Sequence, residues 1–427
     1  MSTPDLRARV VVPHYEAPER LARLLAALDA QTGAAFEVVV ADDGSRVPPD
    51  PGPRAYPVRV VAQADEGFRA AAARNLGAGA GGASGPDALL FLDADMVPTP
   101  TYVAAMLAAL RGADVVVGRR RHTDLTGRTP EEIRAWLTRA STTDNPAGPA
   151  ALGAPVLPEP GWLADGYAAT GGLADLSDDG FRYVISAVLG VRRDTFERLG
   201  GFEESFVGYG GEDWEFAHRA WLAGADFAYV PAAVAWHDGP DWGGRHDEDE
   251  AGRRARVAAK NVESLAVADL VPSPRHRDDH RVWSVPRVLV ELDPAVAALE
   301  GAEAFAVVAD LVRGSDARVV VAAGAPVRRV WPAGDPALLD DPPGRAVTGR
   351  SPWRARVHAP VRLDEPGALT RLVEAGEAAY VADGRPVLTL RHARSIARGQ
   401  EPPRREWPHP LPAPGPPDLE ARWGGWG

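Results

Sequence analysis

The sequence of 427 residues contains no cysteine. This excludes a disulfide framework, a thiol nucleophile and a metal site built on thiolates. Long apolar runs are missing too, since no stretch approaches the ~18 consecutive apolar residues that a membrane-spanning helix needs. The first residues show no basic segment followed by an apolar run, which a secretory signal would require. We therefore expect a cytoplasmic protein without a membrane span, and peripheral attachment to a membrane stays open.

Positive charge is in deficit, because 47 Lys and Arg face 59 Asp and Glu, a net charge of −12. Nucleic-acid binders gather an excess of Lys and Arg, so we expect no nucleic-acid partner. An anionic ligand must then be met locally, by a metal ion or by a few placed arginines. The composition, 45% hydrophobic and 25% charged, is that of a soluble globular protein. The length allows two or three domains.

The first hundred residues alternate strand and helix signals. Short apolar runs at 9–13, 36–40, 58–62 and 88–92 predict strands, while leucines at helical spacing in 18–31 and an alanine-rich stretch at 69–78 predict helices. Each strand ends in polar turn residues. This pattern predicts a mostly parallel α/β sheet whose ligands lie beyond the carboxyl ends of the strands.

Two carboxylates close the run at 88–92, because Leu92 is followed by Asp93, Ala94 and Asp95. On a continuing strand, residues at i and i+2 point to one side, so both acids would face the same ligand. Hard oxygen donors suit Mg²⁺ or Mn²⁺, with substrate phosphates and water completing the shell. An isolated pair of this kind is more often an ordinary turn, but here Asp43 is expected on the same rim.

A glycine-rich loop leads into a second acidic pair. Gly208, Gly210 and Gly211 surround Tyr209, and Glu212 and Asp213 open a predicted helix at 213–223. Acids at a helix start are commonly capping residues. The glycines additionally allow the backbone to approach a ligand closely, which favours a cleft with a general base. The helix N-terminus is expected to keep Asp213 ionised.

His237 ends a predicted strand at 229–236. A single histidine is more often a surface or core residue than a metal ligand. Between 119 and 180 the chain reads as irregular, with one helix at 130–140, and a strand is expected at 183–191.

The C-terminal third repeats part of the N-terminal layout. Residues 287–293, 295–312 and 317–324 read as strand, helix and strand, and residues 379–387 echo 90–98 with one acid, Asp383. Two interpretations stay open. One is a shortened second copy that has lost its ligand chemistry and packs, forms a homodimer or shapes the acceptor site, and the other is an unrelated small α/β domain.

The expected domains are 1–275, 285–399 and a tail at 400–427. The tail is rich in Pro, Gly and Trp, and we expect it to be extended on the surface.

In chain order, the motifs resemble those of family 2 glycosyltransferases, which have the GT-A fold, a Rossmann-like sheet. The resemblance covers about residues 8–275. It is carried by Val11–Tyr15, Val39–Ser45, Gly67–Ala70, Ala73–Gly77, Leu92–Asp95, Gly200–Glu204 and Tyr209–Trp214. The Gly-Gly-Glu-Asp-Trp portion also resembles the acceptor-side motif of β-1,4-galactosyltransferases and polypeptide N-acetylgalactosaminyltransferases.

The resemblance implies a role for each matching position. Pro13 and Tyr15 would hold uracil, Asp43 would accept from its N–H, and Arg69 would lie near the UDP. Asp93 would contact ribose or a metal-bound water, and Asp95 and His237 would bind Mn²⁺ or Mg²⁺. Glu212 would bond the donor sugar and Asp213 would be the catalytic base, with the acceptor near Tyr209, Gly210, Gly211 and Trp214.

Two positions depart from the family pattern. His14 stands where a small hydroxyl residue is common, and residues 186–189 replace a Gly/Asn-rich strand.

The implied function is metal-dependent, inverting transfer of a hexose from UDP-glucose or UDP-galactose to a hydroxyl of a soluble acceptor. The acceptor could be a secondary metabolite, an aminocyclitol or a saccharide. The alternatives are a sugar-phosphate nucleotidyltransferase and a non-catalytic carbohydrate-binding or assembly protein. A nucleotidyltransferase normally has a Gly-rich basic loop where Pro13-His14-Tyr15-Glu16 stands.

Overall fold

The structure is a computed structural model that describes residues 6–82, 85–140, 148–208, 210–240, 249–277, 282–412 and 417–422. The chain divides into two compact units, each considered by itself. Unit 1 comprises Met1–Trp221 and Ala225–Ala266, and unit 2 comprises Leu222–Gly224 and Val267–Gly427. Among the described helices, none is both long enough and apolar enough to cross a membrane.

Unit 1 is built on a nine-stranded sheet in the order β3-β2-β1-β4-β8-β6-β9-β5, with β7 paired to β6. Strands β3, β2, β1 and β4 run parallel. The central strand β1 buries Val10, Val11 and Val12 completely, as expected for a parallel strand covered on both faces. The strands are β1 (Ala8–His14), β2 (Phe36–Asp42), β3 (Val58–Ala62), β4 (Ala88–Leu92), β5 (Met96–Pro98), β6 (Val115–Thr123), β7 (Val156–Leu157), β8 (Val188–Arg192) and β9 (Phe227–Asp238).

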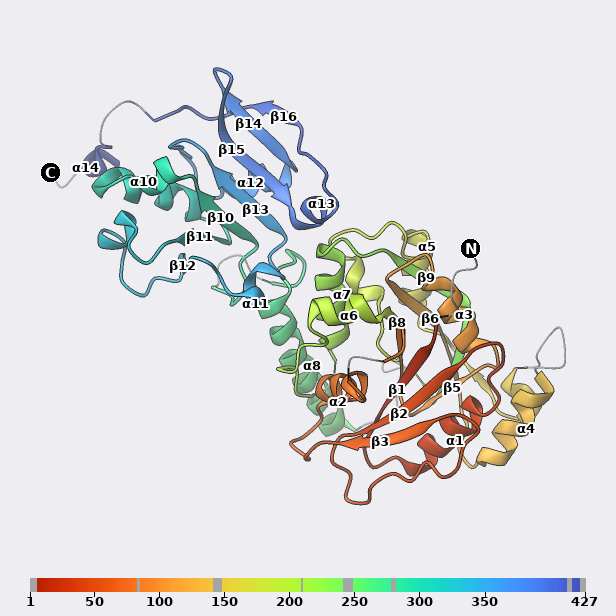
Figure 1. The fold of residues 1–427 in the computed structure, drawn as a ribbon. Coiled ribbons are helices and arrows are strands. Elements are labelled where there is room, and N and C mark those ends of the chain that lie inside the picture. The colour runs from red at the N-terminus through yellow and green to blue at the C-terminus, as the bar shows by residue number, and fades with distance from the viewer. Residues whose placement is uncertain are drawn as a thin grey trace. The chain divides into compact units, whose positions relative to one another are not determined.

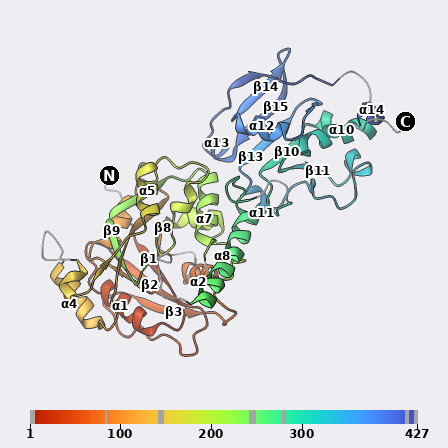
Figure 2. The same ribbon diagram turned by 180° about the vertical axis from the view of Figure 1, so that it is seen from behind.

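Helices lie on both faces of this sheet (Figures 1 and 2). Helix α1 packs on α4, and α2 packs on β1 and β2. Asn75 of α2 also bonds the backbone of Phe202, 2.8 Å from its N–H and 2.9 Å from its carbonyl oxygen. The helices are α1 (Pro18–Leu28), α2 (Ala70–Gly79), α3 (Tyr102–Ala109), α4 (Pro130–Ala140), α5 (Gly161–Ala169), α6 (Arg193–Leu199), α7 (Glu212–Leu222) and α8 (Glu250–Leu270).

The expected mostly parallel α/β sheet is confirmed, with three local corrections. Residues 161–169 form helix α5, whereas the sequence predicts only one helix, at 130–140, between residues 119 and 180. The strand predicted at 183–191 begins later, since 180–183 are a 3₁₀ turn and β8 starts at Val188. Residues 93–95 are a turn between β4 and β5, with Met96 N–H bonded to Asp93 O at 3.0 Å, so strand alternation does not govern Asp93 and Asp95.

Unit 2 has a seven-stranded sheet in the order β12-β11-β10-β13-β15-β14-β16. Its core is formed mainly by valine and leucine side chains of the sheet and of the helices packed on it. The strands are β10 (Val288–Leu292), β11 (Ala317–Val321), β12 (Leu338–Asp340), β13 (Trp353–Val357), β14 (Ala378–Ala382), β15 (Arg385–His392) and β16 (Arg404–Glu406). The helices are α9 (Pro294–Ala297), α10 (Gly301–Val312), α11 (Arg345–Thr348), α12 (Ala368–Glu374), α13 (Ala393–Ala397) and α14 (Leu419–Arg422).

Three expectations for this unit need correction. The predicted helix at 295–312 is split into α9 and α10. Residues 404–406 of the tail are a strand paired with β14, so the tail is not wholly a surface extension. Strand β14 does not take the place of β4 beside the first strand, because the strand beside β10 is β13. The echo of 90–98 in 379–387 is therefore not a structural correspondence.

Two glycines on α2 provide a test of how this helix packs on the sheet. A Cβ at Gly77 would lie 2.5 Å from Val11 Cγ1 and 3.2 Å from Ala41 Cβ, whereas one at Gly79 would meet nothing within 4 Å. We expect Gly77→Ala to lower the free energy of unfolding by about 1–3 kcal/mol, the usual range for overpacking. Gly79→Ala, the matched control, should be neutral or gain up to ~1 kcal/mol from helix propensity. Urea unfolding measures both, and equal stabilities would contradict the close packing.

Candidate active site

The carboxyl ends of β1, β2 and β4 lie side by side and carry the first group of predicted site residues. Asp43 follows β2, and its buried carboxylate accepts from Gln63 Nε2 at 2.5 Å and from the backbone N–H of Arg69 at 2.8 Å. The β2 turn is held by Gly44, which has φ +87° and where a Cβ would lie 2.3 Å from the Asp65 backbone nitrogen. The structure therefore fixes Asp43 on the rim and joins it to the start of α2.

Pro13 and Tyr15 stand at the end of β1. Pro13 is half-buried within the strand, and Tyr15 is 45% exposed, with its hydroxyl donating to Asp65 at 3.2 Å. His14 between them is buried, and its Nδ1 lies 2.9 Å from Asp42. His14, which departs from the family pattern, is therefore part of the packing at the strand ends. The ring of Tyr15 stays accessible for stacking with a ligand ring.

Arg69 and Arg74 differ in what they contact. The Arg69 guanidinium pairs with Glu66, a neighbour in the chain. Arg74, one turn further along α2, is buried and reaches two site carboxylates, Asp93 at 2.7 Å and Glu212 at 2.7 Å. Burial opposes its charge, but Asp93 and Glu212 outweigh this and raise the pKa of Arg74. Sequence reasoning gave Arg74 no role, although it lies inside a family motif.

Asp95 and His237 are brought together by sheet pairing. Strand β5 pairs antiparallel with β9, with Met96 opposite His237, and Asp238 N–H bonds Asp95 O at 2.9 Å. His237 Nε2 then lies 3.4 Å from Asp95 Oδ2. Although burial acts the other way on each group, the contact lowers the pKa of Asp95 and raises that of His237.

This pair fits a divalent metal. Nδ1 of His237 lies 2.9 Å from the carbonyl oxygen of Gly239 and donates to it. In the neutral ring the lone pair is therefore on Nε2, the nitrogen that faces Asp95. A metal ion would replace the proton that Nε2 and Asp95 otherwise share. Within the described part of the chain, no group of three or more Asp, Glu or His is placed to hold a metal, so a substrate or water would supply the other ligands.

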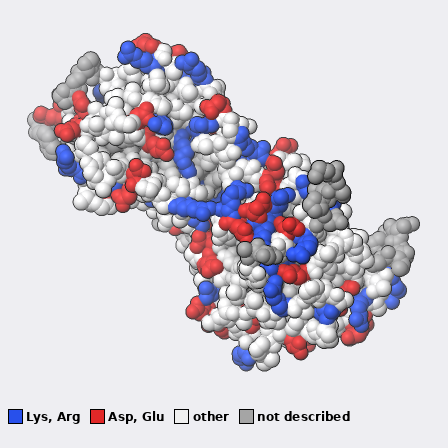
Figure 3. Space-filling view, in the orientation of Figure 1, with Lys and Arg blue, Asp and Glu red and all other residues white. Residues whose placement is uncertain are grey.

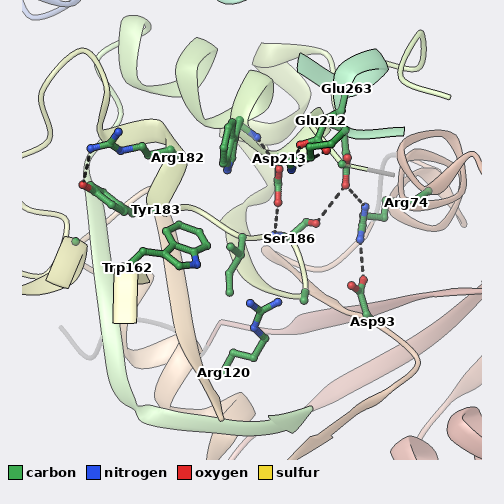
Figure 4. A pocket seen from close by; sticks show the side chains of 18 of the residues that line it. Arg74, Asp93, Arg120, Trp162, Arg182, Tyr183, Ser186, Glu212, Asp213 and Glu263 are labelled. Atoms are coloured by element: carbon green, nitrogen blue, oxygen red, sulfur yellow. Dashed lines mark hydrogen bonds and ion pairs between the residues drawn. The ribbon is translucent and has the colours of Figure 1, made fainter. Parts of the chain in front are cut away.

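Asp213 lies on the wall of a pocket of about 820 Å³ that Asp93, Arg74, Ser186 and Glu212 also line (Figure 4). Its carboxylate accepts from Trp214 N–H at 2.8 Å and from Ser186 N–H at 3.3 Å. Removal from water and the nearby charge of Glu212 raise the pKa of Asp213 to about 7, against the opposing effects of Ser186 N–H and Arg74. The backbone N–H groups of Ser186 and Trp214 favour the ionised form of Asp213, as expected at the start of a helix, but burial has the larger effect on its pKa.

Gly210, Gly211 and Trp214 also line this pocket, while Tyr209 lies outside the described residues. Gly210 passes close to α8, where a Cβ would come 2.9 Å from the Glu263 carboxyl carbon. Glu263 is held by Lys260 Nζ at 2.7 Å from each oxygen, and Lys260 also lies 5.8 Å from the Trp214 ring centre. The glycine-rich loop thus packs tightly against an ion pair at one end of the pocket.

The charge of unit 1 is mixed in sign. On the face drawn in Figure 3, basic side chains alternate with acidic ones. Within the pocket, Arg74 is matched by Asp93 and Glu212, and Lys260 by Glu263. Arg74 and Lys260 are therefore already paired with carboxylates of the pocket.

Two family models match unit 1. The model of glycosyl transferase family 2 matches residues 9–152, and that of the N-terminal domain of galactosyltransferase matches residues 178–236. These regions run from the first strand of unit 1 into its ninth, so unit 1 is similar to glycosyltransferase domains over most of its length. Its sheet agrees with the GT-A fold expected from the sequence.

Two relatives illustrate the similarity. A hyaluronan synthase of Pasteurella multocida is 30% identical over 278 residues, which are 62% of this chain and 27% of that protein. A validoxylamine A glucosyltransferase of Streptomyces hygroscopicus subsp. jinggangensis is 35% identical over 232 residues, 49% of this chain and 50% of that protein. The chain spans between about a quarter and half the length of these relatives.

Among solved structures, a mannosyltransferase from Pyrobaculum calidifontis with GDP-Man and Mn²⁺ is 19% identical. The similarity has a TM-score of 0.40 and covers 62% of this chain and 65% of that one.

The raised pKa of Asp213 predicts how stability depends on pH. Between 3.8, its ordinary value, and about 7, the folded protein holds a proton that the unfolded chain releases, so stability falls as pH rises through this window. Asp213→Asn removes the titration and should stabilise the protein increasingly from pH 4 to pH 7. The ceiling is about 4 kcal/mol, roughly three pKa units at ~1.36 kcal/mol each.

Urea unfolding of both proteins at pH 4, 5.5 and 7 measures the difference. Glu374→Gln removes an exposed carboxylate of unit 2 and controls for the loss of one negative charge. A gain for Asp213→Asn that does not change with pH would contradict the assignment.

Proposed function

We propose that unit 1 is a metal-dependent, inverting glycosyltransferase that moves a hexose from a UDP-sugar to a hydroxyl group of an acceptor. The observation that carries the proposal is the position of the Asp213 carboxyl group on the wall of the pocket that also holds Asp93, where burial raises its pKa to about 7. A base of this pKa is suited to accept a proton near neutral pH. The family match supports the reaction class.

In the proposed reaction Asp213 takes the proton of the acceptor hydroxyl as its oxygen bonds to the anomeric carbon. The bond from that carbon to the diphosphate oxygen breaks, and its electron pair leaves with UDP. A single displacement of this kind inverts the anomeric centre. General base catalysis contributes about 10²–10⁴-fold to such a step.

Asp95 and His237 would hold a Mn²⁺ or Mg²⁺ ion, which would stabilise the negative charge of the leaving diphosphate. Asp93 would contact the ribose or a metal-bound water. Tyr15, whose ring is exposed, would hold uracil together with Pro13, and Asp43 would accept from the uracil N–H. Arg69 would lie near the UDP, and its present partner Glu66 would have to exchange with a phosphate.

Glu212 would bond the donor sugar, with Gly210, Gly211, Tyr209 and Trp214 on the acceptor side. The name of the validoxylamine A glucosyltransferase supports glucose as the donor sugar and a small acceptor. The synthase names of other relatives support a saccharide acceptor.

Replacing the base separates chemistry from binding. We expect Asp213→Asn to retain UDP binding and to lose at least about 10²-fold in kcat, because the proton acceptor is gone. For the wild-type protein, kcat/KM should rise with pH through an apparent pKa near 7, since the deprotonated form is the active one. UDP release from UDP-glucose measures both effects, and near-normal turnover of the variant would exclude Asp213 as base.

Removing a metal ligand should abolish donor binding instead. Isothermal titration of the wild-type chain with UDP should give uptake that requires Mn²⁺ and disappears with EDTA. Asp95→Ala should lose that uptake, because one of two protein ligands is missing, whereas Glu374→Gln should retain it. Unchanged Mn²⁺-dependent UDP binding by Asp95→Ala would refute the metal assignment. Release of UDP from UDP-glucose by the wild-type chain without Mn²⁺ would favour a different mechanism.

A further inference from the structure

The two matched family regions leave residues 153–177 between them, and this segment forms one wall of the Asp213 pocket. It contains α5, which brings Trp162, Asp165 and Gly166 to the lining. Figure 4 shows Trp162 and Tyr183 on the side of the pocket opposite Asp93 and Arg74. The wall opposite Asp93 and Arg74 is therefore built partly from a segment that neither family model covers.

The aromatic side chains of this wall are fixed by close packing. The rings of Trp162 and Tyr183 stack at 6.5 Å with an interplanar angle of 30°. A Cβ at Gly166 would lie 2.3 Å from the Tyr183 ring, so only glycine lets the ring lie on α5. Trp162 nevertheless keeps 44% of its surface exposed, which leaves it accessible to a ligand.

Arg182 adds hydrogen-bond donors to the same wall. Its guanidinium lies 5.0 Å from the Tyr183 ring centre and donates to the Tyr183 hydroxyl at 2.9 Å. Its buried Nε has no hydrogen-bond partner among the described residues. Since arginine only donates, a ligand that contacts the Arg182 guanidinium would present an oxygen acceptor, while the exposed carboxylate of Asp165 can accept from a hydroxyl.

The wall is joined to the proposed base through a short segment. Tyr183 precedes Ser186 by three positions, and the Ser186 N–H bonds the Asp213 carboxylate at 3.3 Å. A ring resting on the aromatic wall would therefore share the pocket with Asp213.

We propose that Trp162, Tyr183 and Arg182 form the acceptor subsite, where the apolar face of a pyranose ring stacks on Trp162 and its oxygens accept from Arg182. This inference rests on the proposed function and names its acceptor class as a pyranoside. An aromatic surface with a few convergent polar groups is the usual composition of such a pocket.

Saturation-transfer difference NMR on the full chain, with UDP and Mn²⁺ present, tests this subsite. The probes are methyl β-D-glucopyranoside and methyl β-D-glucuronide at equal concentration. We expect saturation transfer to at least one glycoside in the wild-type protein. The transfer signal should fall about tenfold in Trp162→Ala and be partly retained in Trp162→Phe. A larger effect of Arg182→Gln on the glucuronide would identify a carboxylate as the group that Arg182 binds.

No transfer to either glycoside in the wild-type protein, or equal transfer in Trp162→Ala, would overturn the subsite. Mn²⁺-dependent UDP binding, titrated in the same samples, reports the donor site separately. Retained UDP binding in those cases would leave the proposed function standing.

A second inference concerns unit 2 and rests on strand pairing alone. Numbered along the chain, its strands lie in the order 3-2-1-4-6-5-7. Unit 1 without its short strands β5 and β7 has the same order. The directions agree as well: the first four strands in this order are parallel, the next two pairings are antiparallel and the last is parallel.

The registers also agree. In unit 1 Ala8 faces both Phe36 and Ala88, and in unit 2 Val288 faces both Ala317 and Trp353. Counting from these pairs, Val38 opposite Val58 corresponds to Val319 opposite Leu338. Ala88 opposite Arg192 corresponds to Trp353 opposite His392. In both units a helix, α6 or α13, begins on the very next residue.

We infer that unit 2 is a second, shortened copy of the unit 1 fold that has lost the donor site. The shared registers place Gly324, His358 and Pro360 where Asp43, Asp93 and Asp95 stand in unit 1. Only residues 398–403 separate α13 from β16, so the segment equivalent to α7, which carries Glu212 and Asp213, is absent there.

Internal ion pairs fill the corresponding rim of unit 2. His358 Nδ1 lies 2.8 Å from Asp293, its Nε2 lies 2.9 Å from Thr389 Oγ1, and Arg356 donates to Asp293 at 2.6 Å. These groups satisfy one another, and the three positions that correspond to Asp43, Asp93 and Asp95 carry no carboxylate. The chain should therefore have a single donor site.

An experimental structure of the full chain, grown with UDP and Mn²⁺, tests the inference. We expect residues 288–406 to superpose on the seven shared strands of unit 1, with nucleotide in unit 1 only. A different strand order would overturn the copy, and nucleotide in unit 2 would overturn the loss of its site. Titration should agree, with one UDP per chain and none for Asp95→Ala. Absence of nucleotide from both units would count against the proposed function. The superposition of the two units would then still test whether unit 2 is a copy of unit 1.

Discussion

The buried guanidinium of Arg74 is the interaction on which the site of unit 1 depends. It joins Asp93 at the end of β4 to Glu212 at the start of α7, and these carboxylates are more than a hundred residues apart in the chain. Removing one partner of a buried ion pair leaves the other charge uncompensated, which costs more than the pair itself contributes. The arrangement therefore fixes the positions of α2, the end of β4 and the start of α7 relative to one another. It also sets the surroundings of Asp213, whose pKa is raised by Glu212 and lowered by Arg74.

The proposed metal site depends on a different constraint, the pairing of β5 with β9. Asp95 and His237 come together because the turn after β4 delivers a short strand to the edge of the sheet, beside the end of β9. Arg23 of α1 bonds Asp238 at 2.6 Å, and Asp238 accepts from Leu125 N–H at 2.8 Å. A buried residue next to His237 is thus tied to two further elements, which limits how far the histidine can move.

Unit 2 shows how little of this chemistry comes from the sheet itself. Its strands share the order, direction and registers of unit 1, yet the rim carries Gly324 and Pro360 where unit 1 has aspartates. A fold can persist without the side chains that once gave it a ligand, because the core and the rim are separate sets of residues. Val288, Val290, Val319 and Val321 of β10 and β11 are buried like the valines of β1 and β2.

The sequence by itself determined the α/β class and the residues at strand ends, since apolar runs and their polar stops are local signals. Asp43 and Asp93 follow predicted strands, and Glu212 and Asp213 follow a glycine-rich loop at the start of a predicted helix. The order of these motifs carries the resemblance to family 2 glycosyltransferases. The sequence did not reveal Arg74, or the wall formed by Trp162 and Tyr183, because an arginine on a helix and a tryptophan in an irregular stretch carry no local sign of their partners. The tertiary structure alone decided that Asp213 loses enough water to raise its pKa and that Asp95 meets His237. Both outcomes depend on groups brought close from distant parts of the chain, and solvation and charge act through space.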